Sequence, residues 1–200
     1  DWWYGPKTIP RERLQQMGKL SARDREIESE KEGIRQGLLF PFTTSAGIYH
    51  CAGDKRLSSA SPTLTFVSYS GAGGMNGEQS GLSVKSMSAI VNPSDKYVYV
   101  EESDPRQYNM GSWIISMGAG SNWIDPVAPW HNDYSTLSWA DGHATTKKWL
   151  SENTKKAARN TVGTPSRPGT FSFGFYDKDN RDIMYMKEHY ATNRKSGNAL

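Results

Sequence analysis

His131-Asn132-Asp133-Tyr134-Ser135-Thr136-Leu137-Ser138-Trp139-Ala140-Asp141-Gly142-His143 places a histidine nine residues ahead of an Asp-Gly pair. Leu137, Trp139 and Ala144 alternate with polar neighbours on either side of that pair. Asp-Gly between two alternating segments is the strongest short signal for a two-residue hairpin turn, because both turn residues need a positive φ. The sequence therefore predicts a β-hairpin over residues 136–149 with Asp141 and Gly142 at its turn.

His131 has two interpretations. In the structural one, its side chain hydrogen-bonds an adjacent loop or strand and fixes the register of the hairpin. In the functional one, a metal ion draws on His131, Asp133, Asp141 or His143, since imidazole and carboxylate groups are ordinary ligands. Asp141 and His143 stand two residues apart across a tight turn, which makes convergence on one small ion awkward. The structural interpretation is therefore preferred.

Outward from the hairpin, local patterns predict a mixture of helices and strands. Charged residues and good helix formers indicate two helices, 11–18 and 22–36, the second ending at Gly37. Residues 38–42 form an apolar cluster that we expect to be the first contribution to the core, and the glycines of 71–81 indicate a plain loop. The predicted strands are 63–69, 96–101 and an extra one at 170–176, where Phe171, Phe173 and Phe175 alternate, and a last short helix is predicted over 182–190.

Four further segments resemble, in order, those of the H-X9-D-G pilin-like proteins, which carry prepilin-type N-termini and are related to the major pseudopilins of type II secretion. They are Gly37-Leu38-Leu39-Phe40-Pro41-Phe42, the segment 48–56 (Ile48-Tyr49-His50-Cys51-Ala52-Gly53-Asp54-Lys55-Arg56), Ser68-Tyr69-Ser70 with Met75-Asn76-Gly77, and Tyr97-Val98-Tyr99-Val100-Glu101-Glu102. The resemblance covers about residues 33–149. Ala52 departs from it, since the family usually has proline there, and nothing after Trp149 has a counterpart.

The resemblance implies an α+β fold: a loop-rich, pilin-like or pseudopilin-like globular head with a small antiparallel β-sheet. We expect an N-terminal helical segment at 1–36, the head at 37–150, and a C-terminal extension at 151–200 that packs on the head. The family's apolar N-terminal helix, which anchors the precursor in a membrane, is not among the residues printed, because no run of about 20 apolar residues occurs. The implied function is that of a non-catalytic structural subunit of a type II secretion or type IV pilus-like filament.

The same resemblance implies the setting of the protein. The full-length precursor would be processed by a prepilin peptidase and would be membrane-anchored, in the periplasm or at the cell surface. Its partners would be further copies of itself and other pilin-like subunits. No cofactor is required. Major pseudopilins hold calcium in a late loop, so Asp125, Asp133 and Asp141 with loop carbonyls are candidate ligands on resemblance alone.

Composition excludes several other classes. The formal net charge of +3 does not indicate a nucleic-acid binder, although residues 143–200 hold eleven Lys or Arg against five Asp or Glu. Cys51 is the single cysteine, so no intrachain disulfide exists, and we expect it to be a small buried packing residue. Glu101-Glu102-Ser103-Asp104 is interpreted as a solvated surface run. No Gly-x-Ser-x-Gly or His-Glu-x-x-His motif occurs, and the sequence does not indicate an enzyme.

A secreted carbohydrate-binding module is the alternative function. Trp113, Trp123, Trp130 and Tyr134 lie in one loop-rich region, and aromatic faces with polar rims suit a polysaccharide. The competing explanation is that these rings pack the core of a head with few strands. The exposure of the rings separates the two explanations, since a sugar platform must face the solvent.

Overall fold

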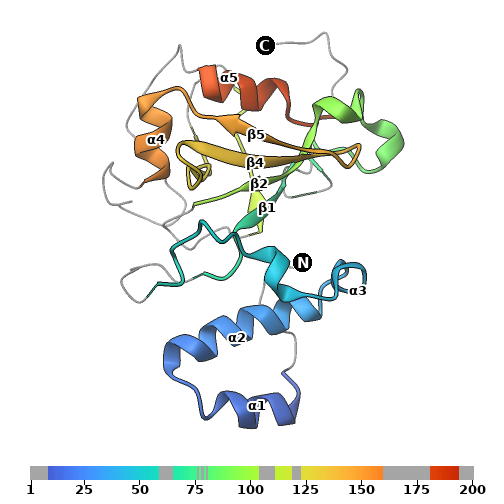
Figure 1. The fold of residues 1–200 in the computed structure, drawn as a ribbon. Coiled ribbons are helices and arrows are strands. Elements are labelled where there is room, and N and C mark those ends of the chain that lie inside the picture. Colours follow the sequence, from blue (N-terminus) through green and yellow to red (C-terminus); the bar gives the residue numbers. More distant parts are fainter. Residues whose placement is uncertain are drawn as a thin grey trace. The chain divides into compact units, whose positions relative to one another are not determined.

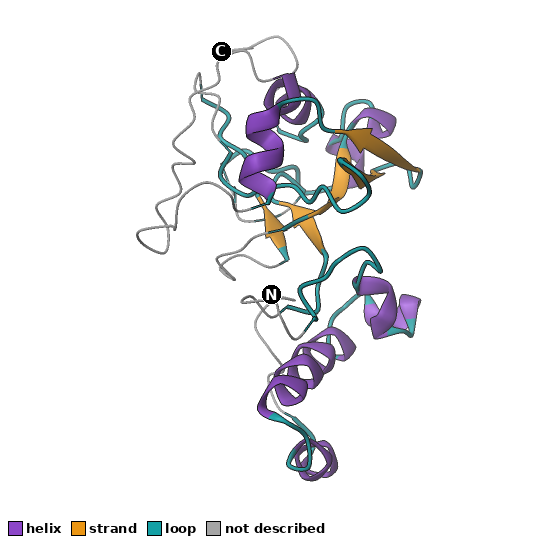
Figure 2. Cartoon of the chain, turned by 60° about the vertical axis from the view of Figure 1, so that its left-hand side comes forward, coloured by secondary structure: helices purple, strands orange, loops and turns teal. Residues whose placement is uncertain are grey.

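The computed structural model describes residues 9–58, 65–75, 77, 79, 81–103, 111–118, 123–159 and 181–193. The chain divides into two compact units, Asp1–Tyr69 and Ser70–Leu200, called here the N-terminal and the C-terminal unit. This single boundary differs from the two that the sequence suggested, after residues 36 and 150. The described part of the N-terminal unit holds helices and loops, whereas the strands belong to the C-terminal unit, with the first one beginning at the boundary (Figure 2).

The N-terminal unit is built on a pair of helices, as the sequence predicted. Its elements are α1 (Arg11–Met17), α2 (Ala22–Arg35), α3 (Phe40–Thr43) and the 3-10 helix η1 (Ala46–Tyr49) (Figure 1). Ser21 caps α2, because its Oγ accepts a hydrogen bond from the backbone N–H of Asp24 at 3.1 Å. Its buried apolar side chains among the described residues are few: Met17, Ile34, Cys51 and Phe66.

The apolar cluster at residues 38–42 does not form the core that the sequence predicted. The side chains of Leu38 and Phe42 are 89% and 85% exposed. The reason is local, since α3 is a single turn that begins at Phe40 and has Pro41 in its first turn. A helix this short cannot turn all of its apolar side chains toward one face.

The C-terminal unit contains a five-stranded sheet in the order β3-β1-β2-β4-β5 (Figure 1). The strands are β1 (Tyr69–Ala72), β2 (Tyr97–Glu101), β3 (Ser112–Trp113), β4 (Tyr134–Trp139) and β5 (Ala144–Lys148). The fold is thus α+β. The sheet is mixed rather than purely antiparallel, because β1 and β3 pair in parallel while β4 pairs antiparallel with β2 and β5.

The remaining elements of this unit are the 3-10 helices η2 (Met87–Ala89) and η3 (Pro93–Asp95) and the helices α4 (Glu152–Ala158) and α5 (Arg181–Glu188). The predicted last helix is therefore present. Its apolar positions Ile183 and Met186, and Tyr190 just beyond it, are at most 2% exposed and belong to the core of this unit. The predicted strand with Phe171, Phe173 and Phe175 lies outside the described residues.

Aromatic rings fill the interior of the C-terminal unit. Trp113 is fully buried and lies between Tyr97, Trp123 and Tyr190, with ring centroids 5.7 to 6.3 Å apart. Trp149 continues the set by meeting Trp123 edge-on at 6.2 Å. Each such ring removes roughly 150–250 Å² from water, which lets a sheet with few aliphatic residues keep a core.

The predicted strand at 63–69 is wrong for residues 65–68, and residues 63 and 64 are not described. Backbone groups of this segment bond partners other than a neighbouring strand. The N–H of Phe66 donates to Glu30 at 2.8 Å, and the carbonyl of Val67 accepts from Arg56 at 3.1 Å. The N–H of Ser68 donates to the carbonyl of Tyr49 at 2.9 Å. The strand begins later, at Tyr69, and runs into the segment predicted as a glycine loop. Gly74 is needed there, since a Cβ at this position would meet Tyr190 at 2.8 Å and the carbonyl oxygen of Ala191 even closer.

No helix within the described ranges is long and apolar enough to cross a membrane.

Candidate functional site

The residues of the H-X9-D-G pattern lie at the two ends of β4. His131 stands in the connection before the strand, and Asp141 and Gly142 stand in the turn after it. The predicted hairpin is present, since β4 and β5 pair antiparallel with Leu137 opposite Thr145.

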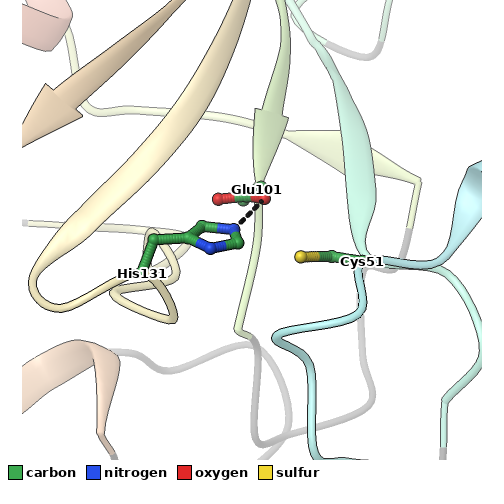
Figure 3. A group of neighbouring side chains, drawn as sticks. All are labelled: Cys51, Glu101 and His131. Atoms are coloured by element: carbon green, nitrogen blue, oxygen red, sulfur yellow. Dashed lines mark hydrogen bonds and ion pairs between the residues drawn. The ribbon is translucent and has the colours of Figure 1, made fainter.

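At the first end, His131 binds Glu101, the last residue of β2. Its Nε2 lies 3.0 Å from Oε1 of the carboxylate (Figure 3), and because a carboxylate only accepts, the imidazole donates. The other oxygen, Oε2, accepts the backbone N–H of Thr136 at 2.8 Å, and the carbonyl of Glu101 accepts the N–H of Ala128 at 2.9 Å. One residue thus joins β2, the segment before the hairpin, and β4.

The carboxylate of Glu101 is buried, whereas the imidazole of His131 is 42% exposed. The interpretation of residues 101–104 as a solvated run is therefore wrong for Glu101, Glu102 and Ser103, which are 0%, 3% and 8% exposed, and Asp104 is not described. A buried carboxylate requires partners, because desolvation of the charge is costly without them. For Glu101 the histidine and the backbone N–H supply them.

Asn132 and Asp133 form the tight two-residue turn that the sequence had placed at Asp141-Gly142. Their φ angles are 56° and 68°, and His131 and Tyr134 on either side exchange both N–H···O bonds at 3.3 Å. Two successive positive φ values are the mark of a type I′ turn, and Asn and Asp tolerate them better than other non-glycine residues do. The turn is tied down further, because the carboxylate of Asp133 pairs with Arg159 and with Lys155 of α4, the latter at 3.5 Å.

The turn at Asp141-Gly142 has a different geometry from the predicted one. Only Gly142 has a positive φ, of 97°. The N–H of Trp139 donates to the carbonyl of His143 at 2.9 Å, and the N–H of Gly142 donates to the carbonyl of Trp139 at 3.0 Å, so three residues connect the strands. A three-residue connection with glycine in the left-handed position is the next commonest hairpin type.

The Asp141 side chain stabilises that turn through His143. Its Oδ1 accepts from Nδ1 of His143 at 2.6 Å and from the backbone N–H of His143 at 3.2 Å. The hydrogen bond from the His143 side chain, with that from its backbone, lowers the pKa of Asp141. The ring of His143 lies flat on Trp139, with centroids 5.5 Å apart.

The three proposed calcium ligands are not brought together. Asp133 and Asp141 flank opposite ends of β4, and Asp125 is 1% exposed and accepts the N–H of Ile114 at 2.8 Å. Within either unit taken alone, the described His, Cys, Asp and Glu side chains contain no group of three that converges on one point. Figure 3 also labels Cys51, which belongs to the N-terminal unit.

The four aromatic residues of the carbohydrate alternative divide into two pairs. Trp113 and Trp123 are 0% and 4% exposed and pack against each other, so neither can stack on a sugar. Trp130 and Tyr134 are half-buried. The alternative thus loses the two rings that form the centre of the core.

A second polar cluster lies in the N-terminal unit, where the sequence analysis assigned no role. The carboxylate of Asp54 is fully buried and accepts Nη2 of Arg56 at 2.7 Å, Nε of Arg56 at 3.0 Å and Oγ of Ser68 at 2.7 Å. Ser68 in turn accepts the N–H of Cys51 at 2.9 Å, and Nδ1 of His50 lies 2.8 Å from the carbonyl of Phe66. Apart from Phe66, these residues come from two of the segments quoted for the resemblance, 48–56 and 68–70, but no spacing rule connects them.

Chemically, the described contacts of both clusters hold backbone segments together. Comparisons with family models, curated proteins and solved structures found no match to this chain.

Proposed function

We propose that this chain is the globular head of a structural, non-catalytic subunit of a type II secretion or type IV pilus-like filament. The observation that carries the proposal is the position of the three signature residues, His131, Asp141 and Gly142, at the two ends of β4. His131 fixes β4 to β2 through Glu101, and Asp141 and Gly142 form the turn from β4 to β5. The signature residues therefore help to fix how β4 is placed against β2 and β5.

The chemistry at His131 supports a structural role over a catalytic one. A general acid or base must reach a substrate proton. Here Nε2 of His131 is occupied by Glu101, and both carboxylate oxygens of Glu101 accept protein hydrogen bonds. Accordingly, replacing His131 with alanine should change the stability of the head and should abolish no reaction.

Precursor processing tests the proposal. The full-length precursor would be produced with and without a prepilin peptidase, and the N-terminus of the product would be read by mass spectrometry. We expect cleavage ahead of an apolar helix of about twenty residues, long enough to span a bilayer. A plain secretory signal removed by ordinary signal peptidase would overturn the proposal.

Assembly is tested on the same cells by cross-linking. Cys51 is buried and can be replaced with serine, so that a cysteine at the exposed position Thr146 becomes the single thiol. Scanning the cysteine over exposed positions on β5 and η2 should give cross-linked ladders that require the peptidase. A chain that stays monomeric at every position, although it is processed, would exclude a filament subunit.

A further inference from the structure

The strand β5 (Ala144–Lys148) forms one edge of the five-stranded sheet (Figure 1). It pairs with β4 on one side, and no strand of the described ranges lies on its other side. All of its residues are exposed except Lys147, which is half-buried. An edge strand presents unpaired N–H and C=O groups to which a further strand can bind. β5 therefore offers a template for a strand from another molecule.

The register between β4 and β5 decides which backbone groups of β5 face outward. The N–H of Trp139 donates to the carbonyl of His143 at 2.9 Å, and at the far end the N–H of Trp149 donates to the carbonyl of Asp133 at 2.8 Å. In an antiparallel ladder every second residue of a strand bonds the same neighbour. The residues between those two ends whose N–H and C=O groups face away from β4 are therefore Ala144, Thr146 and Lys148.

These outward groups are largely open. The carbonyl of Lys148 accepts Nζ of Lys147 at 2.6 Å, and the others have no hydrogen bond within the part of the chain that the structure describes. Natural edges are often blocked by proline, bulges or charges. β5 contains no proline, and its pairing with β4 has no shift of register. Lys147 also binds Asp182 at 3.2 Å, which leaves Lys148, at the end of the strand, as the exposed charge of this edge.

The edge is complementary to a second copy of itself. If two β5 strands lie antiparallel about Thr146, all five residues of each are paired, with Thr146 opposite Thr146 and Ala144 opposite Lys148. Cross-strand threonine pairs are favourable, whereas like charges placed directly opposite each other are destabilising. This register puts no lysine opposite a lysine. Two strands in parallel, residue beside the same residue, would place the lysines next to each other.

We propose that β5 pairs antiparallel with β5 of a second copy of this chain, about a twofold axis at Thr146, so that the two sheets become continuous. Such a contact is isologous and closes on two copies, so it does not by itself extend a filament. The pairing therefore goes beyond the filament proposal and does not depend on it. One pair of five-residue strands is a small interface, so the association is weak and depends on concentration.

Substitution of Ala144 tests the register. Ala144→Glu places a carboxylate opposite Lys148 of the second copy, and the twofold axis creates this pair twice. The dissociation constant, measured by sedimentation velocity of the full chain over a range of concentrations, should fall roughly 2- to 30-fold. Ala144→Lys places like charges opposite each other and should raise the constant by a similar factor.

Ala89 provides the matched control. It is exposed in η2, away from the edge of the sheet, and Ala89→Glu and Ala89→Lys change the net charge of the chain by the same amounts. The effects of these two variants on the dissociation constant measure the contribution of net charge alone. The changes at Ala144 should clearly exceed them.

Exchanging the charges adds a positive test. Combining Ala144→Lys with Lys148→Glu again brings opposite charges together across the twofold axis, so this double variant should recover the pairing that Ala144→Lys loses. Loss in the single variant and recovery in the double variant are expected only when positions 144 and 148 of two copies face each other.

Thr146→Pro tests the backbone contribution. Proline removes an N–H that faces away from β4, a position at which edge strands tolerate it, so the hairpin should remain folded by circular dichroism. Pairing between copies should be lost. Thr146→Ser keeps the N–H and should retain the pairing.

Three results would overturn the proposal. The first is a parent chain and an Ala144→Glu variant that both stay monomeric at every concentration, which would leave the edge to a strand of some other protein. The second is a shift at Ala144 no larger than that at Ala89, or of the same sign for Glu and Lys. The third is a folded Thr146→Pro variant that pairs as the parent does. Precursor processing plays no part in these measurements, so the filament proposal and this one can fail separately.

Discussion

The interior of the C-terminal unit is filled with aromatic rings. In the N-terminal unit a buried carboxylate and a buried guanidinium lie in the interior beside a few apolar side chains. Trp113, Tyr97 and Trp149 are all fully buried in the first. In the second, Asp54 and Arg56 are 4% and 9% exposed and bond each other and Ser68. Apolar packing is non-directional and adds up by area, while a buried ion pair depends on every partner. Substitutions in the interiors of the two units should therefore lower the free energy of unfolding for different reasons.

Two probes separate the units in one sample. Five of the seven tryptophans belong to the C-terminal unit, at positions 113, 123, 130, 139 and 149, so fluorescence reports mainly on it. The thiol of Cys51 is buried in the N-terminal unit, so its labelling rate reports the opening of that unit. Both probes are used in the predictions that follow.

Trp113→Ala should have the largest effect. Truncating a fully buried tryptophan leaves a cavity among Tyr97, Trp123 and Tyr190, and costs roughly 3–5 kcal/mol in the free energy of unfolding. Chemical denaturation followed by fluorescence would measure it. Leu150→Ala, at a side chain 57% exposed, is the control and should have little effect. A loss for Trp113→Ala no greater than that of the control would refute the aromatic core.

Asp54→Asn should come next, and in the other unit. It keeps the shape but leaves the guanidinium of Arg56 buried without its charge partner, which should cost about 1.5–3 kcal/mol. Labelling of Cys51 should become faster while the fluorescence transition stays where it was. Replacing Asp54 and Arg56 together with leucine and methionine should restore part of the loss. If the double variant were less stable than Asp54→Asn, the ion pair would not be the cause.

Gly142→Val should cost roughly 1–2 kcal/mol in the C-terminal unit, because a β-branched residue would be forced to a φ of 97°. No atom lies within 4 Å of a Cβ built there, so the effect isolates backbone strain. Asn132→Gly is the opposite test, since it puts glycine where φ is already positive and should leave stability nearly unchanged. Equal losses in both variants would argue against the two turn geometries described here.

Glu30→Gln should give the smallest effect, and one that depends on pH. Burial raises the pKa of Glu30, although the hydrogen bond from the N–H of Phe66 lowers it. A raised pKa in the folded state means that stability is present below the ordinary value and is lost as pH rises through the raised one. The glutamine keeps an acceptor for Phe66, so its stability relative to the parent should grow from pH 4 to pH 7.

Glu28→Gln is the matched control for that experiment. The hydrogen bond from Lys31 lowers the pKa of Glu28, so its contribution is present above the ordinary value and is lost as pH falls. The difference between this variant and the parent should therefore change with pH in the opposite direction. Parallel pH profiles for the two variants would contradict the assigned environments.

Local sequence patterns predicted the elements whose formation depends mainly on residues within the element itself. Charged residues and good helix formers predicted α2, the β-branched and aromatic run predicted β2, and the spacing of Ile183, Met186 and Tyr190 predicted α5. The prediction failed at 65–68 because the side chains of Glu30 and Arg56, distant in sequence, take the backbone bonds that a strand would need. It failed again at 38–42, where apolar composition says nothing about which way a single helical turn faces.

The candidate site shows the same division. The hairpin was predictable from alternation and an Asp-Gly pair, both of which are local. The pairing of His131 with Glu101 spans thirty residues, and the acidic run that contains Glu101 looks identical to a solvated one. Likewise, nothing local indicated that Asn132-Asp133 rather than Asp141-Gly142 would take two positive φ values, since the ion pairs of Asp133 with Lys155 and Arg159 join residues more than twenty positions apart.

Lys147 offers a chemical readout of α5. Its Nζ lies 3.2 Å from Oδ1 of Asp182, 5.0 Å from the ring centroid of Trp149 and 4.8 Å from that of Tyr185, while its neighbour Lys148 is exposed. An amine that is enclosed by two rings and a carboxylate is shielded from acylating reagents, whereas an amine one residue away is not. Partial acetylation followed by peptide mass spectrometry should therefore modify Lys148 well ahead of Lys147. Loss of that difference between two adjacent lysines would show that α5 has left the sheet.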